Sequence, residues 1–169
     1  MISPEVVAVV EAIRAALPSE REWSMMNSMP APSMATSTVV DAPPTYIEFL
    51  EVADGFICGP AVLFDSQTVT GMQFYTEPPE GSAIPLNRED WYCVGVISDE
   101  PWFIKRADGS VWTFPDAGVT WWMSDRFEQV DTSLENFFLN EVCGPSYLRL
   151  TGALRGDQWW QLLGSLGRL

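Results

Sequence analysis

The sequence predicts an α+β fold in which N-terminal and C-terminal helices pack on a central antiparallel β-sheet. Three observations support this: helical periodicity near both ends of the chain, short β-rich segments between them, and a glycine-containing turn that joins two of those segments. The chain has 169 residues, of which 47% are hydrophobic, so one sizeable core is expected. We expect a single domain over residues 1–169, with 144–169 as a C-terminal helical extension.

The first element is expected to be a helix. Ser3 can cap it, Pro4 suits its first position, and apolar residues then recur on one face until Pro18 ends it. An irregular connection follows over residues 24–41, rich in Ser, Thr, Ala, Pro and Met. Within this connection a short strand is expected at 37–40.

A second helix is expected in "PPTYIEFLEVADGF", residues 43–56. Its two prolines suit a helix start, and Gly55 can take the left-handed conformation that ends a helix. Asp54 is therefore interpreted as part of the helix end and not as a catalytic group. The apolar face consists of Tyr46, Phe49, Leu50 and Ala53.

The middle of the chain is expected to form the sheet. "ADG", residues 107–109, has Gly at the left-handed position and predicts a hairpin between the segments on either side. A long acidic loop, "TEPPEGSAIPLNRED", interrupts the strands, and Trp121 and Trp122 are placed on one more strand. The β-rich segments are "FICGPAVLFD", "TVTGMQFY", "WYCVGVIS", "PWFIKR" and "SVWTF".

Helices are expected again after the sheet. In "VDTSLENFFLNEVCGP", Thr132 and Glu135 match a capping box, and Gly144 with Pro145 end the helix. The remaining residues predict one or two short helices, the second capped by Asp157.

Composition limits the chemistry that is available. There are 23 Asp plus Glu against nine Lys plus Arg, a formal charge of −14, which disfavours nucleic acid and favours a basic partner. There is no histidine, so the usual general base, the Ser-His and Cys-His nucleophile pairs and the commonest metal ligand are absent. Most hydrolase mechanisms are thereby excluded.

Cofactors and membrane segments are not expected. The three cysteines, Cys58, Cys93 and Cys143, lack the spacing of a zinc site and are odd in number, so no disulfide framework is predicted. The N-terminus carries acid where a signal peptide carries Lys or Arg, and no apolar run reaches membrane-helix length. We therefore expect a cytoplasmic protein without a metal.

Carboxylates remain as possible catalytic groups. "NRED" (87–90) and "SDEP" (98–101) each hold two adjacent acids, but neighbouring side chains diverge, and no calcium-loop or phosphate-loop motif occurs. Solvated turns are the simpler interpretation. A carboxylate-based enzyme stays open as an alternative, and it would require two acids converging in one pocket, one of them with a raised pKa.

Three segments, taken in order, resemble the SUKH superfamily, bacterial immunity proteins that also include a fungal cell-wall regulator. "PPTYIEFLEVADGF" is similar to the family's "P-x-x-Y-x-x-F-L-x-x-x-[ND]-G" segment. "WYCVGVISDEPWFIKRADGSVWTFPD" is similar to its central strand and hairpin, and "WWMSDRFEQVDTSLENFFLN" to its closing helix. The resemblance spans residues 3–143 apart from the linker at 24–41.

The resemblance implies a non-catalytic binding module that neutralises a cognate toxin, often a nuclease, by binding it in the cytoplasm. The net charge independently favours a basic partner, because opposite charges steer association. The alternative is a constitutive scaffold or regulator that binds a host protein, as the fungal relatives suggest. We hypothesise that loop acids and one tryptophan anchor form the partner surface, drawn from Glu89, Asp90, Asp99, Glu100, Asp116, Trp102 and Trp112.

Overall fold

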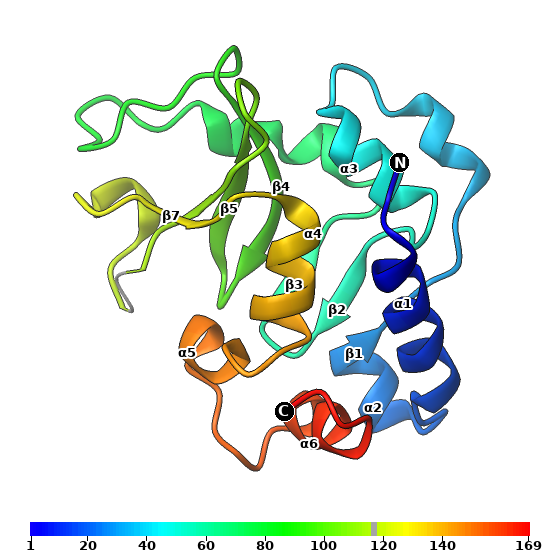
Figure 1. The fold of residues 1–169 in the computed structure, drawn as a ribbon. Coiled ribbons are helices and arrows are strands. Elements are labelled where there is room, and N and C mark those ends of the chain that lie inside the picture. Colours follow the sequence, from blue (N-terminus) through cyan, green and yellow to red (C-terminus); the bar gives the residue numbers. More distant parts are fainter. Residues whose placement is uncertain (116–117) are drawn as a thin grey trace.

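The computed structural model of the chain describes residues 1–115 and 118–169 and contains a seven-stranded antiparallel sheet surrounded by helices (Figure 1). The strands lie in the sheet in chain order. The predicted α+β fold with a central antiparallel sheet is therefore confirmed. The strands are β1 (Asn27–Ser28), β2 (Phe56–Cys58), β3 (Ala61–Leu63), β4 (Trp91–Ile97), β5 (Glu100–Lys105), β6 (Val111–Thr113) and β7 (Glu128–Asp131).

Helical elements precede, interrupt and follow the strands. The expected helix caps at Ser3 and Asp157 are present, since Ser3 Oγ accepts a hydrogen bond from Val6 N and Asp157 Oδ1 accepts one from Trp160 N. The helical elements are α1 (Pro4–Ala16), α2 (Arg21–Met26), η1 (Met34–Thr38), α3 (Pro44–Leu50), η2 (Val69–Thr76), η3 (Trp121–Met123), α4 (Leu134–Asn136), η4 (Phe137–Val142), α5 (Tyr147–Thr151) and α6 (Gln158–Ser165). Here η1, η2 and η3 are 3₁₀ helices and η4 is a π-helix.

The central strands are covered on both faces. Neighbouring residues of a strand point to opposite faces of a sheet, yet Trp102 and Phe103 of β5 are both fully buried. The Trp102 ring packs on Phe137 of η4, with the ring centroids 4.6 Å apart. On the other face, Phe103 packs against the rings of Trp91, Phe114 and Phe127. Figure 1 shows α4 lying across the strands on the helix-covered face.

A glycine in β4 allows this close packing. The pairing register between β4 and β5 shifts between Cys93 and Gly95. At Gly95 a Cβ atom would collide with the carbonyl oxygen of Val62 and with the indole of Trp102. Because Gly95 has no side chain, Trp102 Nε1 of β5 can reach across β4 and donate a 3.0 Å hydrogen bond to Val62 O of β3.

Several predicted strands are wrong. The first half of the strand expected at 37–40 lies in η1 and no strand forms there, whereas β1 lies earlier, at residues 27–28. Trp121 and Trp122 begin the 3₁₀ helix η3, and the last strand is β7 instead. The segment "FICGPAVLFD" is β-rich as predicted and forms the hairpin β2–β3, which turns at Gly59, a residue in the left-handed conformation (φ +59°).

The segment "TVTGMQFY" was also expected to be a strand, but it lies in the 3₁₀ helix η2. Gln73 of this helix forms hydrogen bonds with the backbone of β4, as a neighbouring strand would have done. Its side-chain nitrogen donates to Cys93 O at 2.8 Å, and its side-chain oxygen accepts from Cys93 N at 3.1 Å. One buried amide therefore continues the hydrogen bonding of β4 beyond the end of β3.

The closing helix and the C-terminal extension are tied into the core. Ser133, and not Thr132, caps α4, and Glu135 accepts a hydrogen bond from Ser3 N instead of completing a capping box. In the extension, Trp159 is fully buried and donates to Val142 O at 2.9 Å. The buried apolar residues of the extension belong to the same cluster as those of α1 and the sheet.

Candidate functional site

Asp54 acts within the fold. It is 9% exposed, and its two carboxylate oxygens accept hydrogen bonds from Ser66 N at 2.8 Å and Ser66 Oγ at 3.1 Å. Gly55 beside it is left-handed (φ +76°), and a Cβ atom there would lie 2.7 Å from Leu63 O. Asp54 and Gly55 therefore fix the end of α3 against the chain that leaves β3, which extends the interpretation of Asp54 as part of a helix end.

The predicted partner-binding acids lie at two opposite ends of the β4–β5 hairpin. Glu89 and Asp90 precede Trp91, the first residue of β4, whereas Asp99 and Glu100 follow Ile97, its last residue. The six residue steps between those ends correspond to about 20 Å of extended strand. The four acids therefore do not form one compact site, and Asp116 lies outside the described residues.

The two predicted tryptophan anchors differ. Trp102 was proposed as an anchor, but it is fully buried against Phe137 and its indole N–H is bonded within the sheet, so it has no surface to offer a partner. Trp112 is half-buried, packs on Trp91 and Phe127, and donates from Nε1 to Ser110 Oγ. Only part of the Trp112 ring is accessible.

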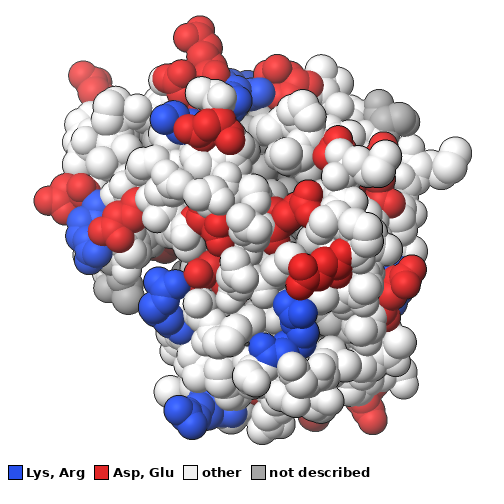
Figure 2. All heavy atoms as spheres, in the orientation of Figure 1, with Lys and Arg blue, Asp and Glu red and all other residues white. Residues whose placement is uncertain are grey.

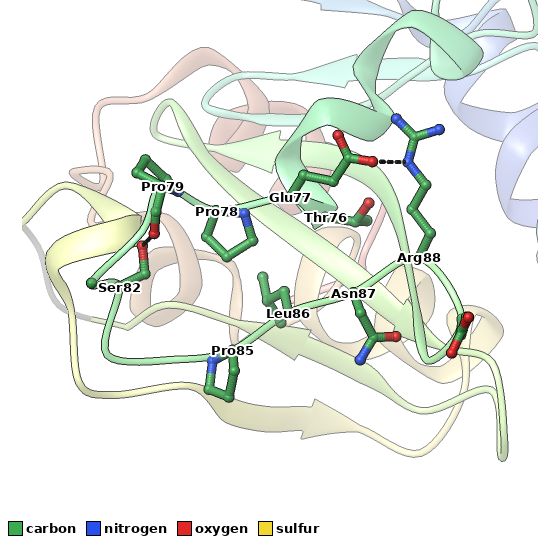
Figure 3. Close-up of a pocket in the computed structure, with 11 residues that line it drawn as sticks. Thr76, Glu77, Pro78, Pro79, Ser82, Pro85, Leu86, Asn87 and Arg88 are labelled. Carbon is green, nitrogen blue, oxygen red and sulfur yellow. Dashed lines mark hydrogen bonds and ion pairs between the residues drawn. The ribbon is translucent and has the colours of Figure 1, made fainter.

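The Glu89 end belongs to the acidic loop, which folds back on itself around a hollow of about 630 Å³ (Figure 3). An ion pair between Glu77 and Arg88, at 2.7 Å, brings the two arms of the loop together. Asn87 Nδ2 donates to Asp90 Oδ2, and Asp90 N donates to Asn87 Oδ1, both at 2.8 Å. Asp90 is therefore engaged within its own turn, while Glu89 is exposed.

The Asp99 end is a two-residue turn. Ser98 and Asp99 both have positive φ, 51° and 70°, which is the geometry of a type I′ hairpin turn. This turn leaves the Asp99 carboxylate exposed. Glu100 instead accepts a 2.8 Å hydrogen bond from Trp121 N and so holds the start of η3. Burial raises the pKa of Glu100, and the Trp121 N–H partly opposes that rise.

Large apolar side chains are exposed beside this turn. Phe74, Trp122 and Met123, which we call the aromatic patch, are 53%, 40% and 62% exposed. They are connected through Tyr75 and Trp121, whose rings lie 5.7 Å apart, and the Phe74 and Tyr75 rings lie 4.3 Å apart.

The hydrogen bond from Trp121 N to Glu100 places the turn acids near the patch, and the pKa of Tyr75 is consistent with this. Burial raises this pKa most, and the Cys93 thiol and the carboxylates of Glu100 and Asp99 raise it further. The turn acids therefore act on the tyrosine that supports the aromatic patch, so the patch has an acidic margin.

The sequence reasoning missed the aromatic patch. A strand over Trp121 and Trp122 places one indole inward and one outward, and the 3₁₀ helix does the same but also leaves Met123 exposed. The repeated tryptophan in "WWM" was the available signal. Phe74 could not be identified because η2 was expected to be a strand.

The charge is unevenly distributed. Residues 144–169 contain Arg149, Arg155, Arg168 and Asp157, a net charge of +2, so residues 1–143 carry the remaining −16 of the total of −14. Figure 2 shows acidic groups over the upper and middle parts of one face, with basic groups prominent in its lower part. The body of the domain is therefore electrostatically more favourable to positive charge than its C-terminal extension is.

Most basic side chains are already engaged inside the protein. Counting only pairs within residues 1–115 and 118–169, five of the nine form ion pairs with acids, those of Arg88, Lys105, Arg106, Arg126 and Arg149. Two more, Arg14 and Arg168, donate to backbone carbonyls. Few basic side chains therefore remain available to neutralise the acidic side chains at the surface.

Comparisons with known proteins add no relative: no protein family, curated protein or solved structure matches the chain. Over residues 1–115 and 118–169, no helix has the length and apolar character required to cross a bilayer. Within the same residues, no three cysteine, aspartate or glutamate side chains are grouped as ligands for a metal ion.

Proposed function

We propose that this protein binds a basic protein partner through the aromatic patch and the adjacent Asp99, and that the partner is a toxin domain which it neutralises. The observation that carries the proposal is the exposure of Phe74, Trp122 and Met123 beside an exposed carboxylate, in a chain of charge −14. Aromatic residues and Met are enriched at protein interfaces, where polar residues form the rim. The toxin as partner class follows the resemblance of the sequence motifs to immunity proteins.

The two parts of the surface would contribute differently. Trp122 offers a large, rigid apolar side chain that can fill a pocket on the partner and supply much of the binding free energy. Asp99, at the margin of the patch, attracts a basic partner and raises the association rate more than the final affinity. If the partner is a nuclease, the carboxylates would occupy the positions of substrate phosphates in its cleft.

The first experiment is a pull-down with this protein as bait, from its own cells and with the protein encoded immediately upstream, washed at low and high salt. We expect a basic, toxic enzyme to be captured and released as the salt concentration rises. Capture of a housekeeping protein instead would favour the scaffold alternative. Capture of nothing would leave the acidity as a matter of solubility and would contradict the proposal.

Variants locate the surface on the captured partner. Trp122→Ala is expected to weaken binding by about 2 kcal/mol, mainly through faster dissociation. Its matched control is Met34→Ala, because Met34 is 96% exposed but lies in η1, away from the patch. Asp99→Lys is expected to slow association, whereas Glu11→Lys on α1 makes the same charge change elsewhere. Equal effects of variant and control in both pairs would show that the partner binds another surface.

A further inference from the structure

The outer face of the first strands carries a partly exposed apolar surface. In β2, Phe56 and Cys58 point inward and are buried, so Ile57 between them points outward. The register places Ile57 beside Val62 of β3, and Val62 beside Val96 of β4, on this same face. All three are only half-buried: Val62 and Val96 also pack against the core cluster, whereas among the described residues Ile57 does not.

This surface leads into a groove of about 200 Å³ that has apolar and acidic walls. Ile57, Val62 and Pro30 contribute apolar surface, while Asp54 and Asp65 contribute carboxylates. The two acids lie near each other, because both line the groove and Asp54 accepts a hydrogen bond from Ser66 N, the residue that follows Asp65. The groove therefore combines an apolar wall with a local excess of negative charge.

The carboxylate of Asp65 has one oxygen available. Its Oδ1 accepts hydrogen bonds from Gln67 N at 3.1 Å and Thr68 N at 2.7 Å. Among the described residues none donates to Asp65 Oδ2, whereas both oxygens of Asp54 accept from Ser66. Within residues 1–115 and 118–169, no basic side chain forms an ion pair with Asp54 or Asp65.

We propose that this groove receives a lysine side chain of the basic partner. The methylene groups of a lysine would lie along Ile57 and Val62, and its ammonium group would reach Asp65 Oδ2. A single carboxylate oxygen suits the compact ammonium group of lysine better than the planar fork of arginine, which prefers two oxygens. The proposal rests on the proposed function for the identity of the partner, but the groove can be tested without that partner.

The experiment is an NMR titration of the full-length ¹⁵N-labelled protein with Nα-acetyl-lysine methylamide. We expect saturable shifts at the amides of Ile57, Val62 and Thr68, which weaken as the salt concentration rises. The uncharged norleucine analogue and the arginine analogue, titrated in the same way, are expected to bind less tightly. Asp65→Asn keeps the acceptor for Thr68 N but removes the charge, and it is expected to weaken binding by up to about fivefold.

A second variant and a control separate the contributions. Ile57→Thr removes part of the apolar wall and keeps a β-branched residue in the strand. It is expected to weaken the binding of the lysine and norleucine analogues alike. Asp125→Asn removes an exposed charge outside the groove and is expected to leave the titration unchanged. Equal binding of lysine and norleucine, tighter binding of arginine, or no effect of Asp65→Asn would each overturn the proposal. Because the titration contains no toxin, such a result would not contradict the proposed function, which the pull-down tests separately.

Discussion

Replacing Asp54 by Ala tests whether this residue is part of the structure or of a functional site. Ser66 is buried, and the substitution leaves both its N–H and its hydroxyl without their acceptor. Hydrogen bonds to a charged group contribute about 1.5–3 kcal/mol each, and a buried donor without a partner costs about 1–3 kcal/mol. We therefore expect Asp54→Ala to lower the free energy of unfolding by about 3 kcal/mol.

Urea unfolding followed by tryptophan fluorescence measures this change. With a slope of about 2 kcal/mol per M, a loss of about 3 kcal/mol moves the midpoint down by about 1.5 M at an unchanged slope. Ser66→Ala removes only the 3.1 Å hydroxyl bond and is expected to cost about 1 kcal/mol. In the double variant the two losses should not add, because the residues share these bonds. An Asp54→Ala protein that unfolds at the wild-type midpoint would refute this structural role.

Two further substitutions test the packing and electrostatics of the fold. Gly95→Ala places a Cβ atom against Val62 O and the Trp102 indole, so we expect a loss of more than about 2 kcal/mol in urea unfolding; an unchanged midpoint would contradict the described β4–β5 packing. Burial raises the pKa of Glu141, against the opposing effect of Arg149. A group whose pKa is raised in the folded state stabilises the protein at low pH, and this stabilisation is lost as the pH rises. Glutamine does not titrate, so Glu141→Gln removes this dependence on pH. Wild type should therefore gain stability relative to Glu141→Gln as the pH falls from about 7 to about 4, and a difference independent of pH would oppose this.

Local sequence signals predicted the elements whose boundaries are fixed by capping and by turns. Ser3 with Pro4 starts α1, Asp157 caps α6, and Gly109 supports the turn between β5 and β6. The connection nevertheless spans residues 106–110, two more than the "ADG" motif suggests, and the hydrogen bond from Lys105 N to Ser110 O closes its base. Signals of this kind act over a few residues, so they give the start of an element more reliably than its length.

The elements that were mispredicted depend on contacts between residues far apart in sequence. Residues 69–76 contain Val, Phe and Tyr, which favour a strand, but the buried bonds between Gln73 and Cys93 stabilise a helix there. In the same way, the bond from Trp121 N to Glu100 fixes η3 where a strand was expected. Neither partner is near in the sequence, so no local pattern announces it.

The candidate site shows the same limit. Asp99 is exposed, as its place in a polar turn suggests, whereas Trp102 was misplaced because alternation in a strand does not say which faces are covered. Helix η4 covers one face of β5 and the rings of Phe114 and Phe127 cover the other. Whether an aromatic residue is exposed therefore depends on which elements cover each face of the sheet, and only the three-dimensional structure shows this.

The way the protein uses its own cations strengthens the argument for a basic partner. Five of the nine basic side chains form ion pairs inside the chain and two bind carbonyl oxygens, so few can move to neutralise Asp65 or Asp99. Both acids lie on turns: hydrogen bonds from Gln67 N and Thr68 N hold the Asp65 carboxylate, and Asp99 lies in the two-residue turn between β4 and β5. A partner would therefore meet fixed negative charge beside apolar surface at two places, the aromatic patch and the groove on β2 and β3. Two separate contacts of this kind favour a partner whose basic groups have the same spacing as the two surfaces. A partner that has only a high net positive charge would bind less well.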